Sequence, residues 1–187
     1  MQIRENVGFQ STSANDERIS KVGKIIRSSK IDELPQIFNV IMGDINFVGP
    51  RPNVKDEVEK YLNVEKRLIN YKPGITDFSS IVFSDEGEIL KNSSDPDLGY
   101  NLYIRPRKNL LALLYFKDRN LVSDMYIILL TVINIFNRKS ALKLIYNFMQ
   151  NRYKNSDLNF ILRDKTLTKI EDINEYFKLN EDKLFWI

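Results

Sequence analysis

Two adjacent carboxylates, Asp32 and Glu33, stand immediately before a segment that has the periodicity of a helix. Unpaired backbone N–H groups and the helix dipole keep carboxylates ionised at such a position. Ionised oxygens of this kind bind a hard cation such as Mg²⁺ or Mn²⁺, and one of them can attack phosphorus. A plainer interpretation is that Asp32 only caps the helix and that Glu33 adds a favourable first-turn charge. For an isolated Asp-Glu pair the plainer interpretation is the better one, so the neighbouring residues decide.

Three cations accompany this pair. Arg27 falls five residues before Asp32 and can therefore lie near the same helix end. Arg51 belongs to Gly49-Pro50-Arg51-Pro52, where two prolines stiffen the backbone around a guanidinium whose fork of donors suits phosphate oxygens. On this tetrapeptide alone, a turn whose Arg faces solvent is equally good. Lys72 opens a second such segment, Lys72-Pro73-Gly74-Ile75-Thr76, in which we expect a type II turn and further donors for phosphate.

The composition limits the available chemistry. The 187 residues include no histidine and no cysteine. This excludes a Ser-His triad, an imidazole base, a Cys nucleophile, disulfides and thiolate zinc sites. Any metal is then expected to be oxygen-ligated Mg²⁺ or Mn²⁺.

The charge balance indicates the class of partner. Residues 150–187 are charge-balanced, so the net charge of +3 comes from residues 1–149. Such a mild excess suits phosphate-bearing small ligands or an anionic membrane surface, and we expect no nucleic-acid partner. We see no signal peptide and no run approaching the roughly 20 apolar residues of a membrane-spanning helix.

The elements that must position these residues follow from local patterns. A helix is expected over residues 17–28, and a second one with Pro35 in its first turn, Ser29 or Asp32 as its cap, and Gly43 after its end. Its apolar positions are Leu34, Ile37, Phe38 and Ile41. A short buried strand over 45–48 and a charged helix over 53–70 come next.

Further elements are expected in the second half. Residues 81–83 are a short strand candidate, and 85–90 and 93–97 are acidic loops or short helices. Apolar residues 110–116 and 125–136 predict helices, the latter preceded by Asp124 and suited to the core or to a membrane interface. The pattern as a whole predicts an α+β, mostly helical fold over residues 1–149, compact, with short strands and Pro/Gly turns. Residues 150–187 are expected to form a C-terminal helical appendage.

The motifs stand in a fixed order that resembles a known family. They are Ile31-Asp32-Glu33-Leu34-Pro35-Gln36, Val48-Gly49-Pro50-Arg51-Pro52 and Lys72-Pro73-Gly74-Ile75-Thr76, followed by Ile104-x-Pro106-x-Lys108, Tyr115 and Asp124. Over residues 11–137 the chain resembles the bacterial sugar transferases, which are polyprenyl-phosphate sugar-1-phosphate transferases (monotopic phosphoglycosyl transferases). As a set these motifs are highly specific, although each alone is weak.

The resemblance implies a reaction and a role for each matched residue. Sugar-1-phosphate would pass from a nucleotide diphosphate sugar, commonly UDP-linked, to polyprenyl (undecaprenyl) phosphate, with release of UMP. Asp32 matches the family's covalent nucleophile and Glu33 its Mg²⁺ ligand. Arg27 and Arg51 match a phosphate-binding pair, and Asp124 lies near the family's C-terminal acidic position. The implied location is the cytoplasmic face of the bacterial inner membrane.

Two departures from the family leave alternatives. Family members begin with a hydrophobic membrane-embedded segment that does not precede the motifs here, so we expect a fragment, a mis-started reading frame or a reduced member. Asp77 replaces the Gly that usually follows the Lys-Pro-Gly-Ile-Thr motif, which places a charge on the acceptor side. The second hypothesis is therefore a catalytically inactive subunit that binds nucleotide sugar or the membrane in the same pathway.

Overall fold

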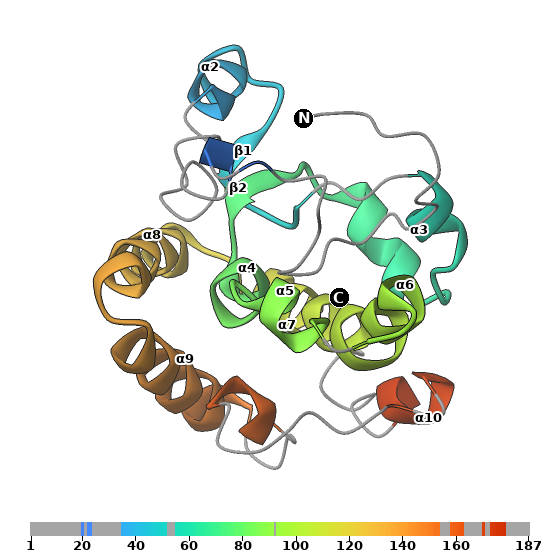
Figure 1. The fold of residues 1–187 in the computed structure, drawn as a ribbon. Helices are drawn as coiled ribbons and strands as arrows, with labels where there is room; N and C mark the ends of the chain where they lie inside the picture. The colour runs from blue at the N-terminus through green and yellow to red at the C-terminus, as the bar shows by residue number, and fades with distance from the viewer. Residues whose placement is uncertain are drawn as a thin grey trace.

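The computed structural model describes Ser20 and residues 22–23, 35–51, 55–91, 93–153, 158–162, 170 and 173–178. Within these ranges the chain is mostly helical, and two short strands form a two-stranded sheet (Figure 1). This confirms the predicted α+β, mostly helical fold. Most of the helix expected over 17–28 lies outside the described residues, as do Arg27, Asp32 and Glu33.

The described elements follow one another along the chain. Their order is α2 (Gln36–Ile41), β1 (Asn46–Val48), α3 (Lys55–Glu59), the 3-10 helix η2 (Glu65–Asn70), β2 (Gly74–Thr76), α4 (Phe78–Val82), α5 (Glu86–Ile89), α6 (Pro96–Gly99), the π-helix η3 (Tyr100–Ile104), α7 (Arg105–Lys117), α8 (Leu121–Phe136), α9 (Arg138–Arg152), the 3-10 helix η4 (Asn159–Ile161) and α10 (Ile173–Lys178).

Helix α7 forms the centre of the hydrophobic core. From Arg105 to Phe116, every residue except Lys108 is buried. Helices α4, η2 and α10 pack against α7, whereas α8 and α9 pack against each other and both contact α4 (Figure 1). The apolar run at 110–116 is therefore a fully buried helix, which explains why it has no polar face.

The two strands run parallel and approach each other unusually closely. Asn46 pairs with Gly74, and Val48 pairs with Thr76. A Cβ atom on Gly74 would lie 2.2 Å from the Gly49 nitrogen, so the crossing requires glycine. The expected type II turn at Pro73-Gly74 is wrong, because Gly74 begins β2 and only Gly43, among the described glycines, has a positive φ.

The helix before Gly43 and the strand after it match their predictions in part. Helix α2 ends before Gly43, whose φ of 80° permits the stop. The N-cap residue of α2 is Pro35, which makes no side-chain hydrogen bond to the helix. The prediction that Ser29 or Asp32 caps a helix containing Pro35 is therefore wrong for α2. Strand β1 forms as expected within 45–48, but of its apolar side chains only Val48 is buried, since Phe47 is 52% exposed.

The strand expected at 81–83 is wrong, because a helix cap overrides the β-branched residues. The Asp77 carboxylate accepts a hydrogen bond from the Ser80 N–H (2.6 Å), and the Ser80 hydroxyl accepts one from the Asp77 N–H (2.9 Å). This capping box starts α4 at Phe78. Local polar contacts therefore decide the conformation of a short apolar segment that periodicity alone leaves ambiguous.

The long helix expected over 53–70 is also wrong. Helix α3 ends at Glu59 and η2 begins only at Glu65. The fully buried Glu65 carboxylate accepts hydrogen bonds from the Leu62 N–H (2.8 Å) and from the Asn109 side-chain amide (2.7 Å). The local contact with Leu62 and the tertiary contact with Asn109 together interrupt a segment whose residues favour a continuous helix.

Some of the remaining elements match predictions with shifted boundaries, whereas α9 (Arg138–Arg152) was not predicted. The acidic segment 85–90 contains the short helix α5, whereas α6 begins within 93–97 and extends beyond it to Gly99. Helix α8 begins at Leu121 instead of 125, because Asn120 and Ser123 form a reciprocal capping box. Asp124 consequently lies within the first turn of α8 and does not precede the helix.

The C-terminal segment contacts the rest of the chain. Helix α9 continues to Arg152, and the buried side chains of Leu158, Ile161 and Phe177 belong to the main core cluster. The Ile170 N–H donates to the Leu102 carbonyl (3.0 Å). The division between residues 149 and 150 stays a prediction.

Candidate active site

The parallel strand pair fixes the backbone that carries Arg51. The Gly49 N–H donates to the Thr76 carbonyl, and the Gly74 N–H donates to the Pro50 carbonyl, each at 3.0 Å. The Gly49-Pro50-Arg51-Pro52 segment, which we expected to present a guanidinium, is thus hydrogen-bonded to β2 through the Gly49 N–H and the Pro50 carbonyl. Arg51 itself is exposed and lines a cavity.

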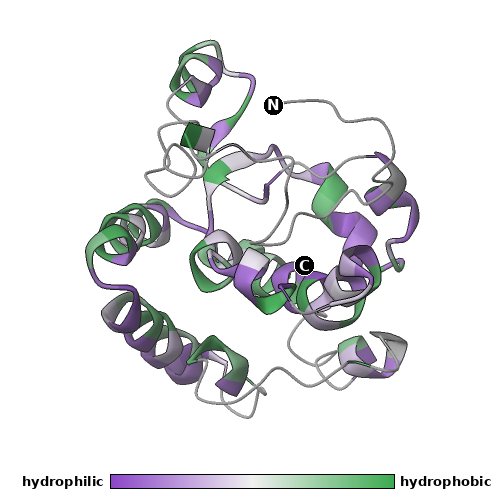
Figure 2. Cartoon of the chain, viewed as in Figure 1, coloured by the Kyte–Doolittle hydropathy of each residue, from purple (hydrophilic) through white to green (hydrophobic). Residues whose placement is uncertain are grey.

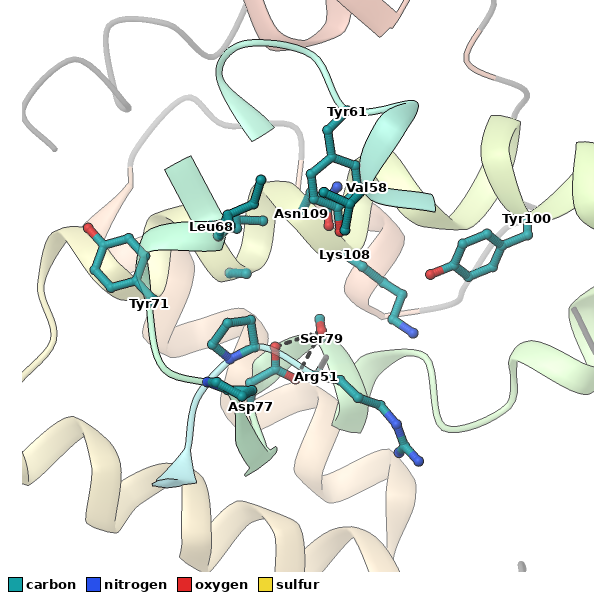
Figure 3. Close-up of a pocket in the computed structure, with 14 residues that line it drawn as sticks. Arg51, Val58, Tyr61, Leu68, Tyr71, Asp77, Ser79, Tyr100, Lys108 and Asn109 are labelled. Carbon is teal, nitrogen blue, oxygen red and sulfur yellow. Dashed lines mark hydrogen bonds between the residues drawn. The ribbon is translucent and has the colours of Figure 1, made fainter. Parts of the chain in front are cut away.

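The cavity has a volume of about 210 Å³ and is lined by the segments that follow β1 and flank β2, and by residues of α3, η2 and α7 (Figure 3). Its charged side chains are Arg51, Asp77 and Lys108, so its lining carries more positive than negative charge. The other lining residues are Pro50, Val58, Tyr61, Leu68, Ile69, Tyr71, Pro73, Ser79, Tyr100, Asn109 and Ala112.

Asp77, which we expected to place a charge on the acceptor side, is buried, and both of its carboxylate oxygens are hydrogen-bonded. Its two carboxylate oxygens accept hydrogen bonds from the Ser79 hydroxyl (2.9 and 2.8 Å), and one of them also accepts from the Ser80 N–H (Figure 3). A carboxylate at a helix N-terminus is further stabilised by the dipole. The structure therefore gives Asp77 the role of capping α4 beneath the cavity.

Lys108 is a cation that enters the cavity from α7. Its amino group forms an ion pair with Glu86 (3.0 Å) and lies 5.6 Å from the centre of the Tyr100 ring. Burial acts to lower the pKa of Lys108, but the Tyr100 and Glu86 oxygens raise that pKa above its ordinary value. Lys108 is therefore protonated at neutral pH.

The structure separates the other described candidates from this cavity. The Lys72 amino group donates to the Gly43 carbonyl and so links β2 to the end of α2. Asp124 accepts a hydrogen bond from the Tyr115 hydroxyl and lies 3.7 Å from Arg119. Burial, and then this bond to Asp124, raise the pKa of Tyr115 well above its usual value. Of Arg51, Lys72 and Asp124, only Arg51 lines the cavity.

The predicted Asp32, Glu33 and Arg27 lie outside the described residues. In the part of the chain that the structure describes, no three acidic residues gather as metal ligands. The cavity's carboxylate, Asp77, has both oxygens engaged in capping α4. The described side chains therefore do not fit a Mg²⁺ site by themselves, and the expected metal depends on Glu33.

Two cavity residues, Lys108 and Tyr100, received no role from the sequence, although Lys108 belongs to the Ile104-x-Pro106-x-Lys108 motif. Lys108 and Tyr100 lie far from Arg51 along the chain, and the fold brings them to the same cavity. The available signal was a cation placed directly before the apolar run of α7, where a lysine is costly unless it is paired.

An apolar surface borders the site. Helix α8 contacts both strands, and α2 contacts β1. One face of α8, opposite the buried Ile127 and Leu130, exposes apolar residues that include Met125 (58%), Leu129 (55%) and Phe136 (85%). Figure 2 shows how apolar the helix is. On α2, Phe38 and Ile41 are 71% and 74% exposed. Among the described helices, none combines the length and apolarity needed to cross a bilayer.

Comparisons with known proteins agree with the motifs. The bacterial sugar transferase family profile matches residues 1–138. The chain is 39% identical over 129 residues to the galactosyl transferase CpsE of Streptococcus agalactiae serotype III, covering 67% of this chain and 24% of that protein. It is 36% identical over 131 residues to the UDP-glucose:undecaprenyl-phosphate glucose-1-phosphate transferase of Klebsiella pneumoniae, covering 68% and 26%.

A shorter and more similar match is the undecaprenyl-phosphate galactose phosphotransferase of Salmonella typhimurium. It is 52% identical over 62 residues, which cover 33% of this chain and 13% of that protein. No solved structure matches the chain. The chain spans about a quarter of the length of the Streptococcus and Klebsiella relatives. Because the family profile matches well over half of its residues, the chain belongs to the bacterial sugar transferase family.

Proposed function

We propose that this protein transfers sugar-1-phosphate from a UDP-sugar to undecaprenyl phosphate, with release of UMP, as the first step of exopolysaccharide, capsule, O-antigen or glycan synthesis. The observation that carries the proposal is the Arg51 turn, which the β1–β2 pair holds at the edge of a cavity with excess positive charge. A guanidinium held by a stiff backbone suits the non-bridging oxygens of a diphosphate. The names of the relatives supply the two substrates.

The proposed chemistry takes place in two steps. A carboxylate oxygen of Asp32 attacks the phosphorus that carries the sugar, and the bond from that phosphorus to UMP breaks, its electron pair leaving on the UMP oxygen. A phosphate oxygen of undecaprenyl phosphate then attacks the same phosphorus and releases the Asp32 carboxylate. Two sequential displacements predict ping-pong kinetics. Asp124 is hydrogen-bonded by Tyr115 and ion-paired with Arg119, so we assign it no step.

Positive charge supports both steps. Arg27 and Arg51 hold the non-bridging oxygens as negative charge develops, and Lys72 adds a cation if it exchanges the Gly43 carbonyl for phosphate. Mg²⁺ or Mn²⁺, held by Glu33, supplies charge neutralisation at the departing phosphate when bound. None of these roles requires histidine or cysteine.

The acceptor is a lipid, so the site must lie against a membrane surface, which we place at the cytoplasmic face of the inner membrane. The exposed apolar residues of α8 and α2 beside the strand pair support this placement. A helix with such a face binds at the boundary between head groups and acyl chains.

The test is a transfer assay with UDP-glucose and UDP-galactose labelled in the sugar, undecaprenyl phosphate and Mg²⁺. We expect UMP release and label in the lipid extract. The same chain fused to the membrane segment of a relative serves as the second enzyme preparation. If neither preparation releases UMP although both bind UDP-sugar, the transferase proposal fails, and the inactive nucleotide-sugar-binding subunit takes its place.

A further inference from the structure

We propose that the cavity lined by η2, α7 and the residues on either side of β2 binds the nucleoside diphosphate part of the donor, with Lys108 as a second phosphate-binding cation at the same end as Arg51. The inference rests on the proposed function, which supplies the class of ligand, but it assigns a site and residues that the transferase motifs leave without a role. It is supported by the charged residues that line the cavity and by the difference between its cationic end and its aromatic end.

The cavity is polarised. Figure 3 shows the Lys108 amino group and the Tyr100 hydroxyl on the side toward which the Arg51 guanidinium extends. Tyr71 and Leu68 lie on the opposite side. A ligand with an anionic end and a flat, less polar end matches this arrangement, and a nucleoside diphosphate has both.

The cationic end can accept phosphate without leaving a buried carboxylate unpaired. Asp77, the carboxylate of the lining, is engaged by Ser79 and Ser80. The partner of Lys108 is Glu86, whose side chain is 40% exposed, whereas that of Lys108 is 17% exposed. Glu86 can therefore turn to water when phosphate oxygens take its place, because its carboxylate, unlike the Lys108 amino group, is accessible to solvent.

The opposite end is stiff and flat. Tyr71 stacks on Phe116 with 3.6 Å between ring centres and 13° between ring planes, so its ring is fixed while it lines the cavity. Aromatic rings held in this way are platforms for planar bases. At about 210 Å³ the cavity is smaller than the ~300–1,000 Å³ that holds a whole drug-sized ligand. It therefore suits the nucleoside diphosphate without the rest of the donor, so that the transferred sugar extends past Arg51.

The experiment measures binding of UDP, UMP, uridine and inorganic phosphate to the full chain by calorimetry. We expect UDP to bind more tightly than UMP, and uridine and phosphate to bind weakly. Lys108→Gln should weaken UDP binding about tenfold or more, the loss of one charge-assisted contact, and should change uridine binding little. Lys91→Gln is the matched control, since Lys91 also pairs with a nearby glutamate (Glu88, 3.4 Å) and is outside the cavity.

Glu86→Gln separates a ligand contact from a structural ion pair. If Lys108 binds phosphate, removing its competitor leaves UDP binding unchanged or tighter. Equal losses in Lys108→Gln and Glu86→Gln would instead make the pair structural and overturn the inference. Unchanged UDP affinity in Lys108→Gln, or no UDP binding by the unmodified chain, would also overturn it.

The transfer assay keeps this inference distinct from the proposed function. Lys108-dependent UDP binding without UMP release leaves the site in place and removes the transferase. UMP release with an unchanged donor KM in Lys108→Gln keeps the transferase and removes the site.

Discussion

A single carboxylate defines the proposed reaction. In Asp32→Asn the anionic oxygen that attacks phosphorus is lost while the side chain keeps its size. We expect UMP release to fall to background, both with acceptor lipid and as a burst without it, because the covalent step comes first. A thermal melt followed by circular dichroism checks that the fold is unchanged. Near-normal turnover in the variant would remove Asp32 as the nucleophile.

Arg51 differs from other surface arginines because the two residues before it, Gly49 and Pro50, are hydrogen-bonded to Thr76 and Gly74 of β2. In Arg51→Lys the charge stays but the two-pronged contact is lost, so kcat/KM for the UDP-sugar should fall roughly 10- to 100-fold, equivalent to about 1.5–3 kcal/mol. Arg119→Lys is the control, since Arg119 pairs with Asp124 away from the cavity. Equal kinetics in the two variants would make Arg51 a structural residue.

At the scale of elements, α4 depends on its cap. In Asp77→Ala the Ser79 hydroxyl and the Ser80 N–H lose their acceptor in a buried place, so the free energy of unfolding should fall by about 1–2 kcal/mol. Asp77→Asn should cost less, because Asn also caps helices. Urea unfolding measures both changes. An Asp77→Ala variant as stable as the unmodified chain would mean that the capping bonds contribute nothing net.

The exposed apolar side chains of α8 are expected to contact the membrane surface. Met125→Gln combined with Leu129→Gln removes two exposed apolar side chains, each worth roughly 1.5–3 kcal/mol when fully buried. Binding to sedimented vesicles with anionic lipid should weaken at least tenfold, with little change in folding stability. Leu144→Gln on α9, where Leu144 is 39% exposed, is the control. Equal vesicle binding by the two variants would remove α8 from the membrane surface.

The sequence predicts elements well where a local signal is strong and poorly where a distant contact decides. The stop at Gly43 and the apolar helices α7 and α8 follow from spacing and local residue preferences. Residues 53–70 do not follow, because the break depends on Glu65 meeting Asn109 from α7. Residues 81–83 were recoverable in principle, since an Asp followed three residues later by Ser is a cap signal that β-branched content outweighed.

At the scale of the whole molecule, the candidate site comes from three segments far apart in sequence. Arg51 follows β1, Tyr71 and Asp77 flank β2, and Lys108 lies on α7. The motif spacing identified Arg51 as a candidate, but no local pattern relates Lys108 to Tyr71. Their meeting depends on the glycine crossing of the strands and on the packing of η2 against α7. A site assembled in this way is readable only after the fold is known.

The C-terminal segment shares a core side chain, Phe177, with the rest of the molecule, which makes the extent of the cooperative fold testable. Phe177 is 4% exposed and belongs to the same core cluster as α7, although it lies in the segment expected to be an appendage. If residues 150–187 unfold together with the rest, Phe177→Ala should lower the free energy of unfolding by about 3–5 kcal/mol within a single urea transition. Lys178→Ala, at an exposed position of the same helix, should change it little. A separate unfolding transition at lower urea concentration, with the main transition unchanged, would instead make the C-terminal segment an independent unit. A core contact that stabilises only its own segment leaves the urea midpoint of the remaining structure at its original value.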